Sequence, residues 1–163
     1  MTAFAHKDRI LEIHPGIAYA HPHHAQLIAA NLRPHEIAEL GALGVGSAVD
    51  YIVRSINRSE IAYAWEVDGT VGCMWGVVLP TLTDNRGYGW TMMTRKIEDH
   101  PFTFLRGSRA VIKAKLELVP EIEGHVEVGF EVSQKWLRWA GFEVEGDLRR
   151  TGSINYYKVR ARR

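Results

Sequence analysis

The segment Pro101–Val119 carries the strongest helical pattern in the chain. Its apolar side chains recur in pairs every seven residues and form one stripe along a rod of roughly 28 Å. These pairs are Phe104/Leu105, Val111/Ile112 and Leu118/Val119, with Ser108 midway. Asp99 can cap this helix, Pro101 can begin it and Pro120 ends it. A helix with a single apolar stripe buries that stripe against another layer, so the rest of the chain has to supply one.

A β-hairpin is predicted in the middle of the chain and provides that layer. Ile61–Val67 and Thr70–Leu79 are rich in β-branched and aromatic residues, and they flank Asp68 and Gly69. This dipeptide supplies the positive φ angles of a tight type I′ turn. Tyr88–Met93 follows as a third strand. Three short segments complete the predicted strands: His125–Val128, Phe142–Val144 and Ile154–Val159.

Helices are predicted on both sides of these strands. Before the hairpin they cover residues 25–32, a segment that begins at Pro34 and a segment that begins at the N-cap Ser47. After it, Val132–Ala140 is an amphipathic helix that ends at Gly141 in a left-handed cap. This order predicts an α+β (α/β-type) fold, with a mixed, largely antiparallel sheet, a long central helix packed on it and helices at the N-terminus. We expect one domain over residues 1–163, with residues 1–60 as its helical N-terminal part.

Charge and cysteine usage limit the classes of function. Twenty Lys+Arg against nineteen Asp+Glu give a formal charge of +1, too balanced to indicate a nucleic-acid or membrane partner for the whole molecule. No apolar run approaches the ~18 residues of a membrane span, and Met1–Leu11 carries Lys7, Asp8 and Arg9 where a signal peptide would be apolar. The single Cys73 cannot form an internal disulfide, which favours a reducing compartment.

Three segments follow one another in an informative order. They are the hairpin AWEVDGTVGCMWG (Ala64–Gly76), the long helix after the next strand, and SQKWLRWAGFE (Ser133–Glu143), a helix that runs into Gly-Phe and a strand. In this order they resemble the GNAT superfamily of acetyl-CoA-dependent N-acyltransferases. The resemblance covers residues 61–144, the recognisable core of the domain.

A narrower similarity rests on three runs: RKIEDHPFTFLRGSRAVI (Arg95–Ile112), WLRWAGFE (Trp136–Glu143) and, upstream, LRPHEIAELGALG (Leu32–Gly44). They resemble a GNAT-like family encoded by tailed bacteriophages, some of whose members are internal virion proteins. The resemblance implies a protein of the bacterial host cytoplasm or the phage virion. Its expected partners are other phage virion or host proteins, or a second copy of itself.

Departures from the superfamily pattern change the expected chemistry. Superfamily enzymes hold the CoA pyrophosphate on backbone N–H groups of a glycine-rich loop at the start of the long helix. Here Met93–Pro101 (MTRKIEDHP) contains no glycine and places Glu98 and Asp99 where the phosphates would lie. Leu137 occupies the position of the usual catalytic Tyr, and Phe130 that of a frequent Asn. We therefore expect a degraded acetyl-CoA site in a protein that acts by binding, as a virion-associated or assembly component.

The alternative is an active N-acetyltransferase that transfers acetyl from acetyl-CoA to an amine with an atypical cofactor loop. Backbone groups of Met92, Met93 and Thr94 would then bind the pantetheine arm, and Arg95 and Lys96 the phosphates.

Such an enzyme needs a general base near the amine. Glu66 and Glu127 are the candidates, because a base on a rigid strand can be positioned against its substrate. For both carboxylates the competing interpretation is a solvated side chain that faces outward.

Two basic clusters invite other interpretations. His21, His23, His24 and His35 lack the paired spacing of structural zinc sites, so no metal is predicted there; surface histidines are favoured over a pH-responsive or interface role. Basic side chains also alternate along the last strand and could bind the phosphates of nucleic acid or of CoA, which would make the chain a nucleic-acid-contacting accessory protein. The competing interpretation is an edge strand that its charges protect from aggregation. These residues are Lys158, Arg160, Arg162 and Arg163.

Overall fold

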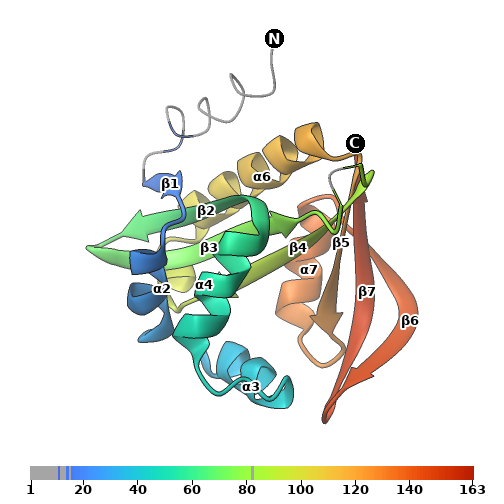
Figure 1. Cartoon of the computed structure of the whole chain (residues 1–163), viewed down its shortest axis with the longest axis horizontal. Coiled ribbons are helices and arrows are strands. Elements are labelled where there is room, and N and C mark those ends of the chain that lie inside the picture. Colours follow the sequence, from blue (N-terminus) through green and yellow to red (C-terminus); the bar gives the residue numbers. More distant parts are fainter. Residues whose placement is uncertain (1–10, 12–13, 15, 82) are drawn as a thin grey trace.

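A single seven-stranded sheet organises the molecule (Figure 1). The computed structural model describes Leu11, His14, residues 16–81 and residues 83–163. The strand order is β1-β2-β3-β4-β5-β7-β6, and every neighbouring pair is antiparallel except β4 and β5. This is the predicted α+β fold with a mixed, largely antiparallel sheet. The strands are β1 (Ile17–Tyr19), β2 (Ser59–Val67), β3 (Thr70–Val78), β4 (Arg86–Met93), β5 (Glu121–Glu127), β6 (Glu143–Thr151) and β7 (Ile154–Arg162).

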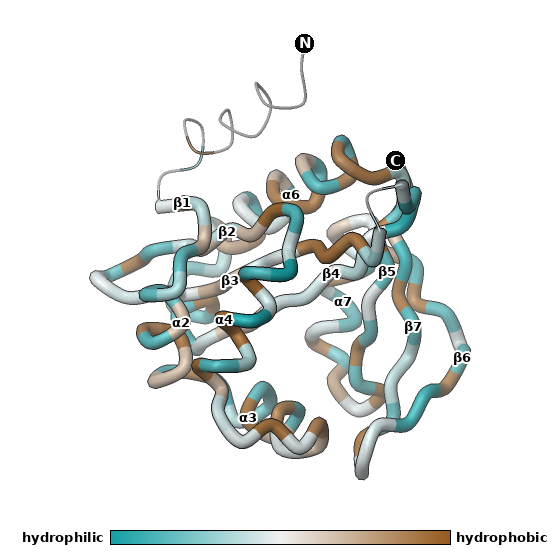
Figure 2. The backbone as a smooth tube through the Cα atoms, in the orientation of Figure 1, coloured by the Kyte–Doolittle hydropathy of each residue, from teal (hydrophilic) through white to brown (hydrophobic). Residues whose placement is uncertain are grey.

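Helices cover both faces of the sheet and enclose two hydrophobic cores. One core, which includes Trp75, Val111 and Ile122, lies under α6 and α7. The other, which includes Ile52 and Met74, lies under α2, α3 and α4. In Figure 2 apolar and polar segments alternate along α6, as expected of a helix with one buried stripe. The helices are α2 (Pro22–Ala29), α3 (Pro34–Ala42), α4 (Ala48–Arg58), the short α5 (Lys96–Asp99), α6 (Pro101–Leu118) and α7 (Glu131–Trp139).

Several local signals act as predicted. Ser47 caps α4, because its Oγ accepts a hydrogen bond of 3.2 Å from the backbone N–H of Asp50. Asp68 and Gly69 have φ angles of 51° and 73°, as the type I′ turn requires. Gly141 adopts a φ of 103° after α7, and the chain then folds back onto that helix.

Other predictions need correction. The N-terminal part also contains the three-residue strand β1, paired with β2, which the helical interpretation missed. Strand β5 starts at Glu121 rather than His125. Its alternating carboxylates are held by basic residues of β7, so the polar pattern hides a central strand. Asp99 does not cap α6: it ends α5, and His100 precedes α6 instead.

None of the helices in the described ranges is long and apolar enough to cross a membrane. The charged residues Lys7, Asp8 and Arg9, on which the expectation of no signal peptide rests, lie outside the described residues.

Candidate active site

The two parallel strands in the middle of the sheet diverge. β4 and β5 pair only through Arg86–Tyr88 and Glu121–Glu123. Beyond this point β4 remains paired with β3, and β5 with β7. A cavity of about 280 Å³ occupies the resulting wedge. A strand edge without a neighbour presents N–H and C=O groups that can bind an extended ligand containing amides.

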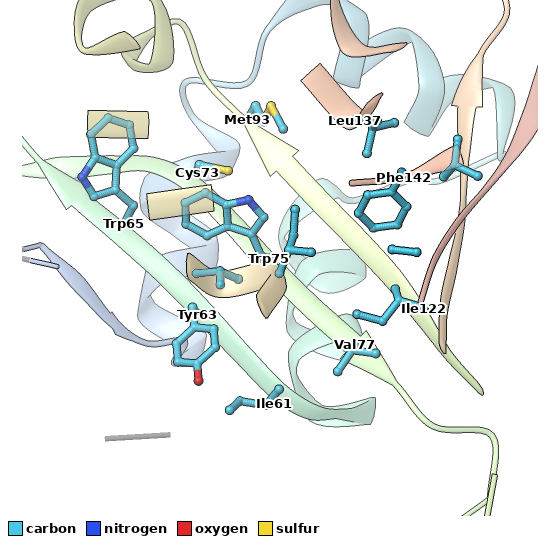
Figure 3. Packing of buried hydrophobic residues seen from close by; sticks show 14 of the residues in the cluster. Ile61, Tyr63, Trp65, Cys73, Trp75, Val77, Met93, Ile122, Leu137 and Phe142 are labelled. Atoms are coloured by element: carbon cyan, nitrogen blue, oxygen red, sulfur yellow. The ribbon is translucent and has the colours of Figure 1, made fainter. Parts of the chain in front are cut away.

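Side chains from both helical layers enclose this cavity. Figure 3 shows Leu137 and Phe142 between the diverging strands, with Trp75 and Met93 on the β3–β4 side. From α6 the lining includes Lys115, and from α3 it includes His35 and other polar residues. The cavity therefore reaches from the α6 side of the sheet to the α3 side through the gap between β4 and β5.

Helix α3 is fixed against the end of β4. The backbone N–H of Arg33, just before the helix, donates to the carbonyl oxygen of Met93 at 3.3 Å, and Leu32 forms a β-bridge with Thr94. The Arg33 guanidinium binds the Glu36 carboxylate through Nε and Nη2, and both side chains are buried. These contacts bring the polar face of α3 to the mouth of the wedge.

His35 links two carboxylates at this mouth. Its Nδ1 lies 3.1 Å from Oε2 of Glu127 on β5, and its Nε2 lies 3.4 Å from Oε1 of Glu39, one turn further along α3. Burial disfavours the charged imidazole, but the hydrogen bond with Glu39 and the charges of nearby carboxylates outweigh it and raise the pKa of His35. Glu127 is thus half-buried and paired, not solvated, and its carboxylate, held by His35, can accept a proton.

Two tyrosines line the same end of the cavity. Burial, followed by the charges of Glu39 and Glu127, raises the pKa of Tyr156 to about 12. Burial and Glu39 also raise the pKa of Tyr51. Both phenols therefore keep their protons at neutral pH and can donate hydrogen bonds. Carboxylates and neutral phenols around one opening favour a cationic group such as an alkylammonium.

Glu66, the other base candidate, lies away from the wedge. Its carboxylate is about half exposed, and its Oε1 lies 2.8 Å from Nε2 of buried His24. Nδ1 of His24 accepts a hydrogen bond from the backbone N–H of His21, so Nε2 carries the proton and donates it to Glu66. This pair closes the N-terminus of α2. The structure therefore separates the two candidates and brings only Glu127 into the cavity.

The predicted cofactor residues are divided between the cavity and the turn that follows β4. Met92 and Met93 line the cavity. Thr94 is buried, and both its backbone N–H and its Oγ1 donate to the carbonyl oxygen of Gly72 at 3.0 Å. The N–H of Lys96 donates to Oγ1 of Thr94. The next turn is the helix α5, whose N–H groups bond within the turn instead of facing outward.

The charge of Lys96 is already paired. Its Nζ lies 3.2 Å from Oδ2 of Asp68 and 3.6 Å from Oδ2 of Asp99. Hydrogen bonds from His100 and Lys96 lower the pKa of Asp68, and the bond with Asp68 raises the pKa of Lys96. Arg95 is exposed and has no ion pair with the described residues, so it is the predicted phosphate contact that stays available.

At the two positions that depart from the superfamily pattern, the side chains pack against neighbouring residues. Leu137 is buried in the cavity wall. The Phe130 ring stacks on His35 with centroids 3.8 Å apart, and the Arg33 guanidinium lies 5.3 Å from its centre. Phe130 therefore positions the imidazole that contacts Glu127.

Lys115 on α6 was not predicted as a site residue. It is 4% exposed, lines the cavity and has no ion pair with the described residues. Burial lowers its pKa to about 7. The sequence did contain a signal for this position: Lys115 follows Val111 by four residues and Ser108 by seven, so it continues the buried stripe.

The basic side chains of the last strand are engaged in ion pairs and hydrogen bonds. Lys158 and Arg160 contact Glu123 at 2.8 and 3.2 Å, and Arg162 contacts Glu121 at 2.9 Å. Arg163 donates to carbonyl oxygens at the end of α6. Nucleic-acid contact through these residues stays a prediction.

Two groups of side chains in the described residues have ligand atoms close enough to share a metal ion: His23, His24 and Glu66, and His35, Glu39 and Glu127. In the first group His24 has both ring nitrogens engaged, and in the second His35 contacts a carboxylate with each nitrogen. The arrangement of both groups is accounted for by hydrogen bonds and ion pairs among the side chains themselves.

Solved structures of GNAT acetyltransferases share this fold. The ribosomal-protein-alanine N-acetyltransferase of Brucella melitensis is similar with a TM-score of 0.67 and 14% identity, over 90% of this chain and 99% of that one. A GNAT-family acetyltransferase of Bacillus anthracis matches with a TM-score of 0.66 and 9% identity, over 90% and 93%. The structure of yncA of Salmonella typhimurium, a proposed acetyltransferase solved with acetyl-CoA, matches with a TM-score of 0.63 and 12% identity, over 90% of this chain and 92% of that one.

No protein-family model and no curated protein matches the sequence. Identities of 9–14% establish the fold alone. The chain has the fold of the GNAT acetyltransferases, and its function has to be argued from its own side chains.

Proposed function

We propose that the protein is an N-acyltransferase that moves an acyl group from a thioester, lodged between β4 and β5, to an amine that enters from the α3 side. The observation that carries this proposal is the Glu127–His35 pair at the mouth of an open wedge. A cavity at the point where two strands of a sheet part is a common place for a ligand.

Binding of the acyl donor would depend on backbone hydrogen bonds more than on charged side chains. Beyond Tyr88 one edge of β4 faces the cavity, and an acyl-pantetheine arm, which contains two amides, can extend along Met92 and Met93 as an added strand would. The diphosphate of CoA has fewer partners, because the turn at α5 uses its own N–H groups and Asp68 holds Lys96. An acyl-CoA thioester, of which acetyl-CoA is the simplest, is thus the expected donor, held mainly by its pantetheine arm and by Arg95.

On the acceptor side the proposed step is attack of the amine lone pair on the thioester carbonyl carbon. A C–N bond forms, the C–S bond breaks, and its electron pair leaves with sulfur as a thiolate. The proton released by nitrogen passes to the Glu127 carboxylate, which His35 holds in place and which can transfer it to solvent. The Tyr156 phenol, protonated at neutral pH, can donate a hydrogen bond to the reacting groups.

The test is acetyl transfer by the purified protein from acetyl-CoA and from acetyl-pantetheine to primary amines, a polyamine among them. E127Q should slow transfer by about 10²–10⁴-fold, as loss of a general base does. E66Q, which alters the strand carboxylate outside the wedge, should change the rate by less than about twofold. Equal rates for E127Q and the unchanged protein would refute the assignment of the base.

A second candidate function is binding without catalysis, with a degraded acetyl-CoA site. Two observations favour it: Leu137 offers no proton to a leaving thiolate, and α5 replaces an open phosphate-binding loop. Isothermal titration with acetyl-CoA distinguishes the candidates, since micromolar binding would contradict a degraded site. The virion-associated or assembly role stays a prediction, and mass spectrometry of purified phage particles would test it.

A further inference from the structure

Lys115 is a buried lysine in the proposed donor cavity. Its side chain reaches the cavity from the α6 side and interacts electrostatically with the Cys73 thiol of β3. Burying an ammonium group is costly unless an anion or several acceptors accompany it. Among the described residues no carboxylate pairs with Lys115, so the described part of the chain does not supply that anion.

The other charged groups of the cavity wall are already matched. Arg33, the other Lys or Arg residue in the lining, is bound to Glu36. Glu123 pairs with basic residues of β7, and Glu127 with His35. Lys115 is therefore the cation of this lining that is left for a ligand.

A second unmatched donor lies in the same lining. The Trp75 side chain is 1% exposed, and its Nε1–H has no acceptor among the described residues. Buried indole N–H groups ordinarily have a partner, so an orphaned one that lines a cavity indicates a missing acceptor. Its ring is held in place by stacking on Phe104, with centroids 6.3 Å apart. An ammonium and an indole N–H together match a carboxylate.

We propose that Lys115 and Trp75 form an anion site on the α6 side of the wedge and select acyl donors whose acyl group ends in a carboxylate, such as succinyl thioesters. The part of this proposal that concerns the acyl donor rests on the proposed function. The thioester carbonyl would lie between the strands, the amine would approach from His35 and Glu127, and the acyl tail would extend toward Lys115. An acetyl group has no carboxylate and would leave the Lys115 ammonium and the Trp75 N–H without an acceptor.

The first measurement is titration calorimetry of the full chain with succinyl-CoA and with butyryl-CoA, which has a tail of similar length without the carboxylate. Succinyl-CoA should bind at least about tenfold more tightly, as a charge-assisted hydrogen bond provides. K115M should abolish that preference, and W75F should reduce it. K113M, which removes an exposed lysine of the same helix, should preserve it.

The second measurement needs no thioester: the thermal shift that succinate alone causes in the unchanged protein, K113M and K115M. One outcome is that succinate stabilises the unchanged protein and K113M but not K115M, while no CoA thioester binds. In that case the anion site stands and the acyltransferase proposal falls. Equal binding of the two thioesters, or a preference that K115M retains, overturns the inference. So does the absence of any effect of succinate when no thioester binds.

Discussion

Nδ1 of His35 on α3 lies 3.1 Å from Oε2 of Glu127 on β5. The two residues are far apart in the sequence, and their contact joins the N-terminal helices to the second half of the sheet across the mouth of the wedge. The stability of this edge therefore depends on one imidazole, and so do the substrate access and proton transfer of the function proposed above.

The first prediction concerns the stability that His35 provides. The folded-state pKa of His35 is raised above the ordinary value of 6.5, so its contribution is fully present below pH 6.5 and is lost as the pH rises through the folded-state pKa. H35Q should therefore lose more stability at pH 6 than at pH 8.5. Urea denaturation at the two pH values measures this, with H23Q on exposed His23 as the control. Equal losses for H35Q at both pH values would contradict it.

The second prediction concerns Lys115, which interacts electrostatically with Cys73 of β3 and lines the same cavity as the Arg33–Glu36 pair of α3. Its pKa falls from 10.5 to about 7 on folding, so the unfolded chain binds more protons between these values and stability rises with pH there. K115M should stabilise the protein by on the order of 4 kcal/mol at pH 6 and by clearly less at pH 9. Denaturation curves at both pH values test this, and a constant difference would exclude titration of Lys115 as its cause.

The third prediction concerns Leu137. A tyrosine at this position would place a phenol in the cavity wall, where a leaving thiolate needs a proton. L137Y should raise kcat for acetyl transfer by about tenfold, a conservative share of what general acid catalysis provides. L137F adds the ring without the hydroxyl and should not. If both variants change kcat alike, the effect is one of shape.

The fourth prediction concerns Asp68, which holds Lys96 and His100. D68N keeps a residue that tolerates the left-handed turn conformation, while it removes the carboxylate that holds His100 and leaves Lys96 with its longer contact to Asp99. CoA should bind several-fold more tightly to D68N, and the gain should shrink as salt increases. The control is D147N, which changes an exposed carboxylate on β6. Unchanged affinity would show that the diphosphate does not approach α5.

Most of the fold could be predicted because its strongest elements carry local signals. The seven-residue repeat in Pro101–Val119, the Asp68-Gly69 turn and the Gly141 cap each determine backbone geometry within a few residues. Strand β1 escaped prediction because three residues are too few to show a periodicity, and only pairing with β2 creates the strand. The start of β5 was missed because its carboxylates are neutralised by residues that lie far along the chain.

The site was predictable only in part for a related reason. Glu127 could be named as a candidate from its strand, and so could Glu66, because sequence alone does not tell which one faces α3. The contact with His35 arises from tertiary packing: Arg33 binds the end of β4, and Phe130 holds the imidazole. Lys115 lay within reach of sequence reasoning, since its spacing continues the buried stripe of the long helix.

The sheet order β5-β7-β6 has a consequence for how the wedge is completed during synthesis. β5 emerges from the ribosome well before β7, its antiparallel neighbour. Until Ile154–Arg162 have been made, β5, which forms one wall of the wedge, is paired with the sheet only through three residues of β4. Nascent or C-terminally clipped chains would thus display the β2–β3–β4 half of the fold without a finished pocket, which forms only when β7 pairs with β5.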